Sequence, residues 1–270
     1  MEERAPTPSV LITGGGTGIG AAAARRMARD GYRVCVAGRR REPLEQVAAE
    51  VGGSWVAVDT SNPGDARHAV ERCVERFGRL DALVVSAGVG ASGTVVEQTL
   101  ERWNGVLATN LTGAFLACQA ALPLLAESRG AIVTVASLAG LRADPASAAY
   151  CASKAGLIML TQCIALDYAR AGIRANCVCP GWIRTPMADA AMDELGAERG
   201  TDREGAYTLA HTEVPAGRAG AAEEAAEAIA WLASPAASYV NGAVLTVDGG
   251  AAVVDVGTLA FAHPELRGES

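Results

Sequence analysis

Residues 10–20 read VLITGGGTGIG, and this stretch decides the fold. Its apolar start predicts a short strand over 10–12, and the alanine-rich run over 21–29 predicts a helix that Gly31 ends. Glycines between them permit a tight turn and let the backbone approach a phosphate, while free N–H groups at a helix start attract negative charge. The order strand, glycine turn, helix therefore indicates a nucleotide site, although packing alone also explains a glycine turn.

Strands and helices alternate along the rest of the chain, as is typical of a parallel sheet with helices on both faces. We expect an α/β fold, a single-domain Rossmann-like doubly wound parallel sheet of about seven strands. No linker divides the chain 1–270. Its core spans 8–250, an irregular segment at about 187–217 is expected to cover a cleft, and a tail follows at 251–270. The predicted strands lie at 10–12, 32–37, 55–58, 80–85, 131–136, 174–179 and 243–247. The predicted helices lie at 21–29, 42–51, 62–77 with Asn62 as its cap, 100–126, 151–170 and 221–233.

The composition is that of a globular chain, with 270 residues of which 50% are hydrophobic and 20% charged. A net charge of -7 disfavours nucleic acid and anionic membranes as partners. No apolar run reaches membrane-spanning length, and the charged start at 1–9 lacks the layout of a signal peptide. We therefore expect a cytoplasmic protein.

The seven cysteines are odd in number and lie mostly in apolar runs, as expected of reduced core residues. Cys177 and Cys179 lack the spacing of a metal site, and alternation along a strand places both thiols on one face. No metal site is expected.

Tyr150 and Lys154 carry the predicted chemistry. They lie four residues apart in a predicted helix, so their side chains share one face. A free tyrosine has a pKa of about 10, and a neighbouring ammonium group lowers this pKa because it favours the phenolate. The pair would then work as a tuned acid or base. Taken alone, the same spacing also occurs on ordinary helix faces.

A run of arginines, Arg39, Arg40 and Arg41, follows Gly38 at the end of the strand predicted at 32–37. In a dinucleotide fold an acidic residue near this place bonds the ribose 2′-hydroxyl, whereas arginine accommodates a 2′-phosphate. No acid stands here, so the loop favours NADP. NAD is the alternative if the arginines form a solvated turn.

In their order, these motifs resemble the short-chain dehydrogenase/reductase family over residues 8–250. The resemblance implies hydride transfer to or from a nicotinamide nucleotide and a homotetramer or homodimer. The residues that match family motifs are Thr13, Gly14, Gly18 and Gly20 in the glycine turn, Asp59 after the third strand, Asn110 within a helix, Ser137 before the central helix, Tyr150 and Lys154 in it, and Pro180, Gly181, Ile183 and Thr185 after the sixth strand.

The resemblance also implies roles for four of these residues. Tyr150 would act as the general acid or base, and Ser137 would hold and polarise the substrate oxygen. Lys154 would lower the pKa of Tyr150 and bind the nicotinamide ribose, while Asn110 would position a water that passes the proton on. The expected cofactor contacts are Gly14, Gly16, Thr17, Gly18, Ile19, Gly20, Gly38, Arg39, Arg40, Val58, Asp59, Thr60, Ala87, Gly88, Asn110, Tyr150, Lys154, Pro180, Gly181, Ile183 and Thr185.

The expected substrate pocket is built mostly of small or apolar residues, which suits a hydrophobic ketone or secondary alcohol. Arg142 either pairs with a substrate carboxylate or is an exposed ion-pairing residue, and His211 either lines the pocket or faces solvent. The candidate pocket residues are Ala91, Ser92, Leu138, Ala139, Leu141, Arg142, Trp182, Met187 and His211.

Two features depart from the family pattern. Ser86 stands where the family has an asparagine, so a hydrogen bond that braces the backbone is expected to be weaker. The chain also continues through 251–270, with an apolar stretch at 253–261. This tail is either a docked or frayed end, or it packs on a neighbouring subunit and helps to close that subunit's pocket.

The function predicted from the sequence is that of an NADP-dependent carbonyl reductase or secondary-alcohol dehydrogenase. An NAD-dependent dehydrogenase that oxidises a hydroxyl-bearing metabolite is the alternative. A non-catalytic nucleotide-binding regulator is a third possibility, against which the intact set of Ser137, Tyr150 and Lys154 argues.

Overall fold

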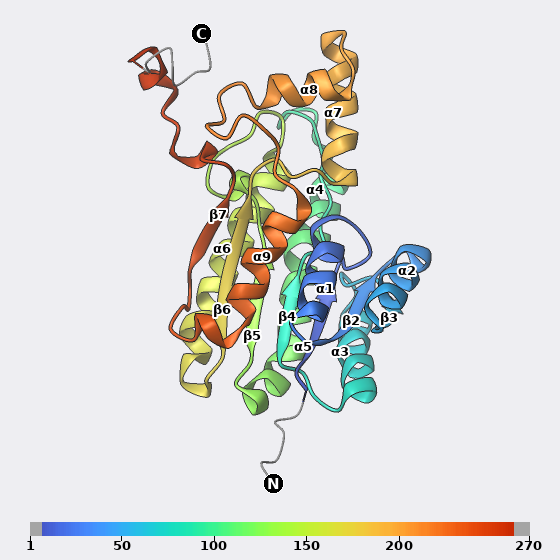
Figure 1. Ribbon diagram of the computed structural model, residues 1–270. Helices are drawn as coiled ribbons and strands as arrows, with labels where there is room; N and C mark the ends of the chain where they lie inside the picture. Colours follow the sequence, from blue (N-terminus) through green and yellow to red (C-terminus); the bar gives the residue numbers. More distant parts are fainter. Residues whose placement is uncertain (1–6, 262–270) are drawn as a thin grey trace.

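Seven parallel strands form one sheet in the order β3-β2-β1-β4-β5-β6-β7 (Figure 1). The computed structural model describes residues 7–261. The chain runs outward from β1 to β3, then returns to β4 beside β1, so the strand order reverses between β1 and β4. This arrangement confirms the doubly wound α/β fold. The strands are β1 (Ser9–Thr13), β2 (Arg33–Gly38), β3 (Ser54–Ala57), β4 (Ala82–Val85), β5 (Ala131–Val135), β6 (Arg174–Pro180) and β7 (Val244–Val247).

Helices cover both faces of this sheet. Buried side chains of α1, α2 and α9 pack on one face, and those of α3, α5 and α6 pack on the other. Strands buried on both faces need mostly apolar side chains, and β1, β4 and β5 are buried along their whole length. The α-helices are α1 (Gly18–Arg29), α2 (Arg41–Val51), α3 (Pro63–Phe77), α4 (Leu100–Leu107), α5 (Gly113–Ser128), α6 (Ala148–Tyr168), α7 (Pro186–Arg199), α8 (Arg203–Ala210) and α9 (Ala222–Ala233).

Two local predictions are confirmed. Asn62 caps α3, because its side-chain oxygen accepts from the backbone N–H groups of Gly64 at 2.9 Å and Asp65 at 3.3 Å. The thiols of Cys177 and Cys179 lie on one face of β6 with their sulfur atoms 3.9 Å apart. Element ends differ from the prediction by one to three residues, as is usual where helices and strands fray.

The helical stretch predicted over 100–126 is confirmed, because the structure is helical over Leu100–Ser128. A π-helical turn, Ala108–Thr112, separates α4 from α5. Such a turn holds one more residue than an α-helical turn, and it often marks a functional site. Here it carries Asn110, whose side chain is fully buried.

The prediction that the segment at about 187–217 is irregular is wrong over most of its length, because the segment contains two regular helices, α7 and α8. The N-terminal signals of both helices stand in the sequence. Thr185 accepts from the N–H of Ala188 at 3.2 Å and precedes Pro186 at the first helical position, while Asp202 accepts from the N–H of Gly205 at 2.8 Å. The segment does cover the cavity described below.

Contrary to the sequence expectation, two helical stretches are long and apolar enough to span a membrane. They are Leu100–Ser128 and Ala148–Ala171, with mean hydropathies of 1.4 and 1.3. Both α5 and α6 pack on the sheet, where Leu125 and Leu157 belong to the core. Burial against the sheet therefore explains part of their apolar composition, since 44% of each apolar window is buried.

Candidate active site

The glycine turn brings the ends of β1 and β4 into close contact. Gly14 has a φ of +67° and Gly18 a φ of +55°, a conformation that favours glycine. A Cβ atom on Gly14 would lie 2.7 Å from the backbone N of Ala87, and one on Gly18 would lie 3.1 Å from Cγ2 of Thr185. Gly20 serves packing, because a Cβ there would strike the carbonyl oxygen of Gly14. The turn thus needs glycine for two distinct reasons.

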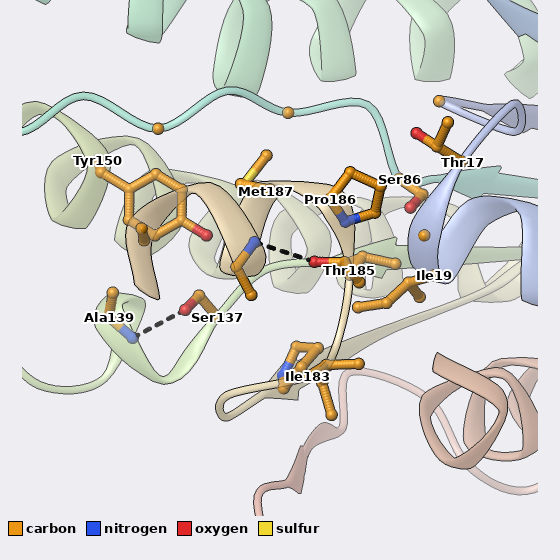
Figure 2. Close-up of a pocket in the computed structure, with 18 of the residues that line it drawn as sticks. Thr17, Ile19, Ser86, Ser137, Ala139, Tyr150, Ile183, Thr185, Pro186 and Met187 are labelled. Carbon is orange, nitrogen blue, oxygen red and sulfur yellow. Dashed lines mark hydrogen bonds between the residues drawn. The ribbon is translucent and has the colours of Figure 1, made fainter. Parts of the chain in front are cut away.

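A cavity of about 1140 Å³ opens at the carboxyl ends of the strands, where the order of the sheet reverses. In the view of Figure 2, Thr185 and Met187 lie between Thr17 and Tyr150. The predicted residues on its wall are Gly14, Gly16, Thr17, Gly18, Ile19, Gly38, Arg39, Arg40, Val58, Asp59, Thr60, Ala87, Gly88, Ala91, Ser92, Ser137, Leu138, Ala139, Tyr150, Lys154, Pro180, Gly181, Trp182, Ile183, Thr185, Met187 and His211. Of the described residues predicted to lie there, those away from the wall are Gly20, Asn110, Leu141 and Arg142.

The hydroxyl groups of Ser137 and Tyr150 face the same part of the cavity (Figure 2). Ser137 follows β5, and its oxygen accepts from the N–H of Ala139 at 3.1 Å, so its own O–H is free to donate. Burial raises the pKa of Tyr150 above its ordinary value, the Ser137 hydroxyl opposes this rise, and the negative charge of Asp144 adds to it. Tyr150 is therefore held as the protonated phenol.

The lowering of the Tyr150 pKa by Lys154 stays a prediction, and the structure shows where the ammonium group lies. Its Nζ atom lies 5.6 Å from the centre of the Tyr150 ring and donates to the backbone carbonyl of Val135 at 2.9 Å. The ammonium is thus directed to the end of β5 and lies beside the Tyr150 ring. Burial lowers the pKa of Lys154 itself to about 8.

Asn110 ties the segment after β4 to helix α6. Its oxygen accepts from the N–H of Val89 at 2.8 Å, and its amide group donates to the Val89 carbonyl at 2.9 Å and to the Ser153 hydroxyl at 3.0 Å. The expected role of Asn110 in positioning a water molecule stays a prediction.

The backbone after β4 is braced without the asparagine that Ser86 replaces. The Thr13 hydroxyl oxygen accepts from the N–H groups of Ser86 at 3.2 Å and Ala87 at 3.4 Å. Asn110 holds the same segment at Val89. Hydrogen bonds from Thr13 and Asn110 therefore hold this backbone segment where the family's asparagine is missing.

Two of the three arginines after β2 face the cavity. Arg40 donates to the Thr17 hydroxyl at 3.2 Å, and the charge of Arg39 helps to lower the pKa of Asp59, an effect due first to hydrogen bonding from Ser61. Arg41 instead lies on α2 and stacks over the Trp55 ring at 5.1 Å. The cavity wall at this end therefore carries two positive side chains.

The candidate substrate residues divide into two groups. Arg142 donates to the carbonyl oxygens of Ala251 at 3.3 Å and Val254 at 3.4 Å, so it holds the start of the tail. Leu141 is 46% exposed and lies off the cavity wall as well. His211, in contrast, is buried on that wall, which settles the choice left open by the sequence.

Sequence reasoning missed three residues that shape the site. Val89 and Ser153 are both hydrogen-bonded to the Asn110 side chain. The Ser153 hydroxyl also donates to the backbone carbonyl of Tyr150 at 2.7 Å. Asp144 lies on the cavity wall near Tyr150. Ser153 could have been found from its place beside Lys154 on the same helix. Val89 and Asp144 lie in loops, and no sequence pattern marks them.

Comparisons with known proteins match most of the chain. A family profile described as enoyl-(acyl carrier protein) reductase matches residues 14–252. Protein MoaE of Klebsiella aerogenes is 40% identical over 94% of this chain and 98% of its own length. Meso-2,3-butanediol dehydrogenase of Serratia marcescens is 35% identical, over 91% of this chain and 95% of its own.

Solved structures agree with these matches. Levodione reductase superposes with a TM-score of 0.89 at 34% identity, covering 93% of this chain and 100% of its own. A variant of the actinorhodin polyketide ketoreductase, solved with NADPH, superposes with a TM-score of 0.88 at 34% identity, covering 92% and 98%.

Proposed function

The chain belongs to the short-chain dehydrogenase/reductase family, an oxidoreductase family that acts on alcohols and ketones, and from this premise we propose its specific reaction. It transfers hydride between NADP(H) and the carbonyl or secondary alcohol of a small, largely apolar substrate. Tyr150 acts as the general acid in reduction and as the general base in oxidation. We also propose that the chain is one nucleotide-binding domain, because one sheet takes strands from both ends of residues 9–247.

The cavity fits a dinucleotide. The glycine turn leaves no side chain between the backbone and a phosphate, and the start of α1 presents free N–H groups there. When bound, the nicotinamide nucleotide would supply or take up the hydride. Gly16, Thr17 and Ile19 would hold its phosphates, while Ile183 and Thr185 would contact the nicotinamide amide.

The observation that carries the proposal is the pair of hydroxyl groups on Ser137 and Tyr150. Because the Ser137 oxygen already accepts from Ala139, its O–H can donate to a substrate carbonyl oxygen. Tyr150 can give its proton to the same oxygen as the carbon accepts hydride, since burial keeps the phenol protonated. Oxidation of the alcohol reverses both steps.

Lys154 serves this chemistry from its buried place. Its pKa of about 8 is close to neutral pH, and its one hydrogen bond goes to the Val135 carbonyl. A bound nicotinamide ribose would offer its hydroxyl groups to the same ammonium, which is the role that the family resemblance implies. We propose that this charge, which lies beside the Tyr150 ring, favours the phenolate during proton transfer once the nucleotide is bound.

Arg39 and Arg40 support NADP as the cofactor. Both lie on the cavity wall after β2, where a 2′-phosphate would meet two positive charges and no acidic side chain replaces them in the loop. The ketoreductase solved with NADPH has the same fold. NAD with oxidation of a hydroxyl-bearing metabolite stays the alternative, since several relatives are named dehydrogenases.

Separate titrations of NADPH and NADH into the purified protein test the cofactor, with nucleotide fluorescence excited through tryptophan. We expect NADPH to bind at least ~10-fold more tightly than NADH, a difference of ~1.4 kcal/mol. Arg39→Gln and Arg40→Gln should remove much of that preference. Arg41→Gln is the matched control, because Arg41 stacks on Trp55 and faces away from the cavity. A preference for NADH would assign NAD, and binding of neither nucleotide would contradict the enzymatic function.

We further propose a cytoplasmic homotetramer or homodimer. Exposed apolar side chains on α5 and α6 support an interface, namely Phe115, Met159 and Leu166 at 44%, 59% and 80% exposure. Light scattering coupled to size-exclusion chromatography measures the mass directly. A monomer at micromolar concentration would contradict an oligomer.

A further inference from the structure

One buried imidazole on the cavity wall has a ring nitrogen without a partner. His211 is only 5% exposed and directly follows α8. Within residues 7–261, its Nε2 atom is buried and makes no hydrogen bond. An unpaired buried polar atom costs about 1–3 kcal/mol, so such an atom beside a cavity calls for a ligand that completes it.

The hydrogen bond of the other ring nitrogen, Nδ1, indicates whether Nε2 donates or accepts, and therefore which ligand group would fit. Nδ1 lies 2.5 Å from the backbone carbonyl oxygen of Tyr207. A carbonyl oxygen can only accept, so Nδ1 carries the proton and Nε2 of the neutral ring bears a lone pair. Nε2 is therefore a hydrogen-bond acceptor.

The ring is held in this orientation from two sides. Tyr207 stacks on it, with the ring centres 5.9 Å apart and the planes 27° from parallel. Tyr207 is itself fixed, because its hydroxyl donates to Asp189 at 2.8 Å and the Arg184 guanidinium lies 4.3 Å from its ring centre. The ring of His211, a residue of the cavity wall, is thus held on a rigid support, as a specificity contact requires.

Other polar groups in this part of the wall are occupied or exposed. Arg218 is exposed and pairs with Glu224 at 2.7 and 2.8 Å. Asp248 accepts from the N–H groups of Gly250 at 3.1 Å and Ala252 at 2.6 Å. Apart from Arg39, Arg40, Asp59 and Lys154, which are assigned to the nucleotide, the other charged residues on this wall are exposed, so water screens them; they are Arg102, Asp144 and Glu194. His211 is the buried group here that still lacks a partner among the described residues.

We infer that His211 determines specificity by accepting a hydrogen bond from a second polar group of the substrate, a hydroxyl or an N–H, away from the reacting carbon. This inference rests on the proposed function and names its substrate class. The substrate is then a ketone or secondary alcohol that carries a further hydrogen-bond donor, such as a hydroxy ketone, a diol or an amino alcohol. Its remaining surface meets apolar neighbours, including Leu138, Trp182 and Val214.

The test compares ligands that differ only in the donor. Cyclohexanones with a hydroxyl at ring position 2, 3 or 4, and the amino analogues, are each paired with the methylcyclohexanone of the same pattern. Binding is measured by ligand-observed NMR in the presence of the preferred nucleotide, and kcat/KM is measured in parallel. Wild-type protein should favour at least one donor-bearing ketone by ~10-fold or more, because a site built to bond a donor rejects the analogue that lacks it.

Two variants of His211 separate its hydrogen bond from its shape. His211→Phe keeps a ring but removes the acceptor, so the preference should fall to ~2-fold or less. His211→Gln places an amide oxygen near the same point and should keep part of the preference. His68→Gln is the control, because His68 lies exposed on α3 and off the cavity wall, and the preference should not change.

The outcomes distinguish this inference from the proposed function. A binding preference lost in His211→Phe supports the inference, even if the ketones are not turned over. Absence of turnover with every ketone would instead count against the proposed function. An equal preference in wild type and His211→Phe, or no preference in either, would overturn the role of His211.

Discussion

At the scale of single residues, burial sets the chemistry of the site more than charge pairing does. Removal from water keeps Tyr150 protonated by raising its pKa, and it lowers the pKa of Lys154 to about 8. Hydrogen bonds then direct each group, Ser137 through Ala139 and Lys154 through Val135. Tyr150 is therefore held in the protonated form that a proton donor needs.

Tyr150→Phe tests the proton donor. The change removes only the hydroxyl, so turnover should fall by about 10²–10⁴-fold, the usual contribution of general acid–base catalysis. Affinity for the nucleotide should stay within about twofold, since the ring that packs in the pocket is kept. Steady-state kinetics and nucleotide titration measure the two effects. Turnover near the wild-type rate would contradict the role of Tyr150.

Lys154→Met tests the buried ammonium through stability. The pKa of Lys154 is about 8 in the folded protein and about 10.5 in the unfolded chain, so between these pH values the unfolded chain binds a proton that the folded protein lacks. The stability cost of burying this charge is fully present below pH 8 and is relieved as the pH rises. Urea unfolding at pH 7 to 10 should therefore show the nucleotide-free wild type gaining up to about 3 kcal/mol relative to Lys154→Met. A stability difference that does not vary with pH would contradict the lowered pKa.

At the scale of elements, the π-helical turn at Ala108–Thr112 joins two parts of the site that the sheet leaves separate. It directs Asn110 to both the Val89 backbone and the Ser153 hydroxyl, so the loop after β4 and helix α6 keep a fixed distance. Gly88 lies between them, where a Cβ atom would be 3.4 Å from Nζ of Lys154. The turn thus supports the wall around Lys154.

Asn110→Ala should destabilise the protein by about 1–3 kcal/mol, because the partly buried N–H and carbonyl groups of Val89 lose their partner. Nucleotide affinity should fall as well, since the loop after β4 loses one of its two braces. Asn104→Ala is the matched control on the exposed face of α4, and its effect should stay within about 0.5 kcal/mol. Chemical unfolding of both variants makes the comparison. Equal effects of the two changes would rule out the bracing role.

At the scale of the whole molecule, the described part of the C-terminal tail leaves the sheet with two large apolar side chains exposed (Figure 1). Arg142 and Asp248 hold its first residues, while Val253 is 83% exposed and Phe261 is 87% exposed. Residues 262–270 lie outside the described part of the chain. The exposure supports the hypothesis that the tail packs on a neighbouring subunit.

Ending the chain after Ala252 tests this hypothesis. Loss of 253–270 should raise the KM for a ketone substrate or reduce the size of the oligomer, because the apolar stretch would no longer cover a neighbour. A chain that ends at Phe261 keeps that stretch and serves as the control. Steady-state kinetics measures the KM and light scattering measures the size of the oligomer. If neither changes, the hypothesis that the tail packs on a neighbouring subunit is contradicted.

The sequence by itself determined the order of the strands and helices, because apolar runs, glycine turns and caps such as Asn62 act over a few neighbouring residues. The same local patterns predicted that Ser137, Tyr150 and Lys154 lie near the carboxyl ends of the strands, where ligands bind in such sheets. These patterns did not predict the helices α7 and α8. Thr185 and Asp202 stand at the starts of these helices, but the polar composition of the segment hides the apolar periodicity that would have pointed to helices.

Only the tertiary structure decided where each functional side chain directs its hydrogen bonds. Lys154 bonds to Val135, Asn110 bonds to Ser153, and Arg142 bonds to the tail, over 19, 43 and more than 100 residues of sequence. These partners meet because packing of helices on the sheet brings distant backbone and side-chain groups together. Burial follows from the same packing, so the pKa of Tyr150 and the free acceptor of His211 are properties of the folded chain, which no local pattern encodes.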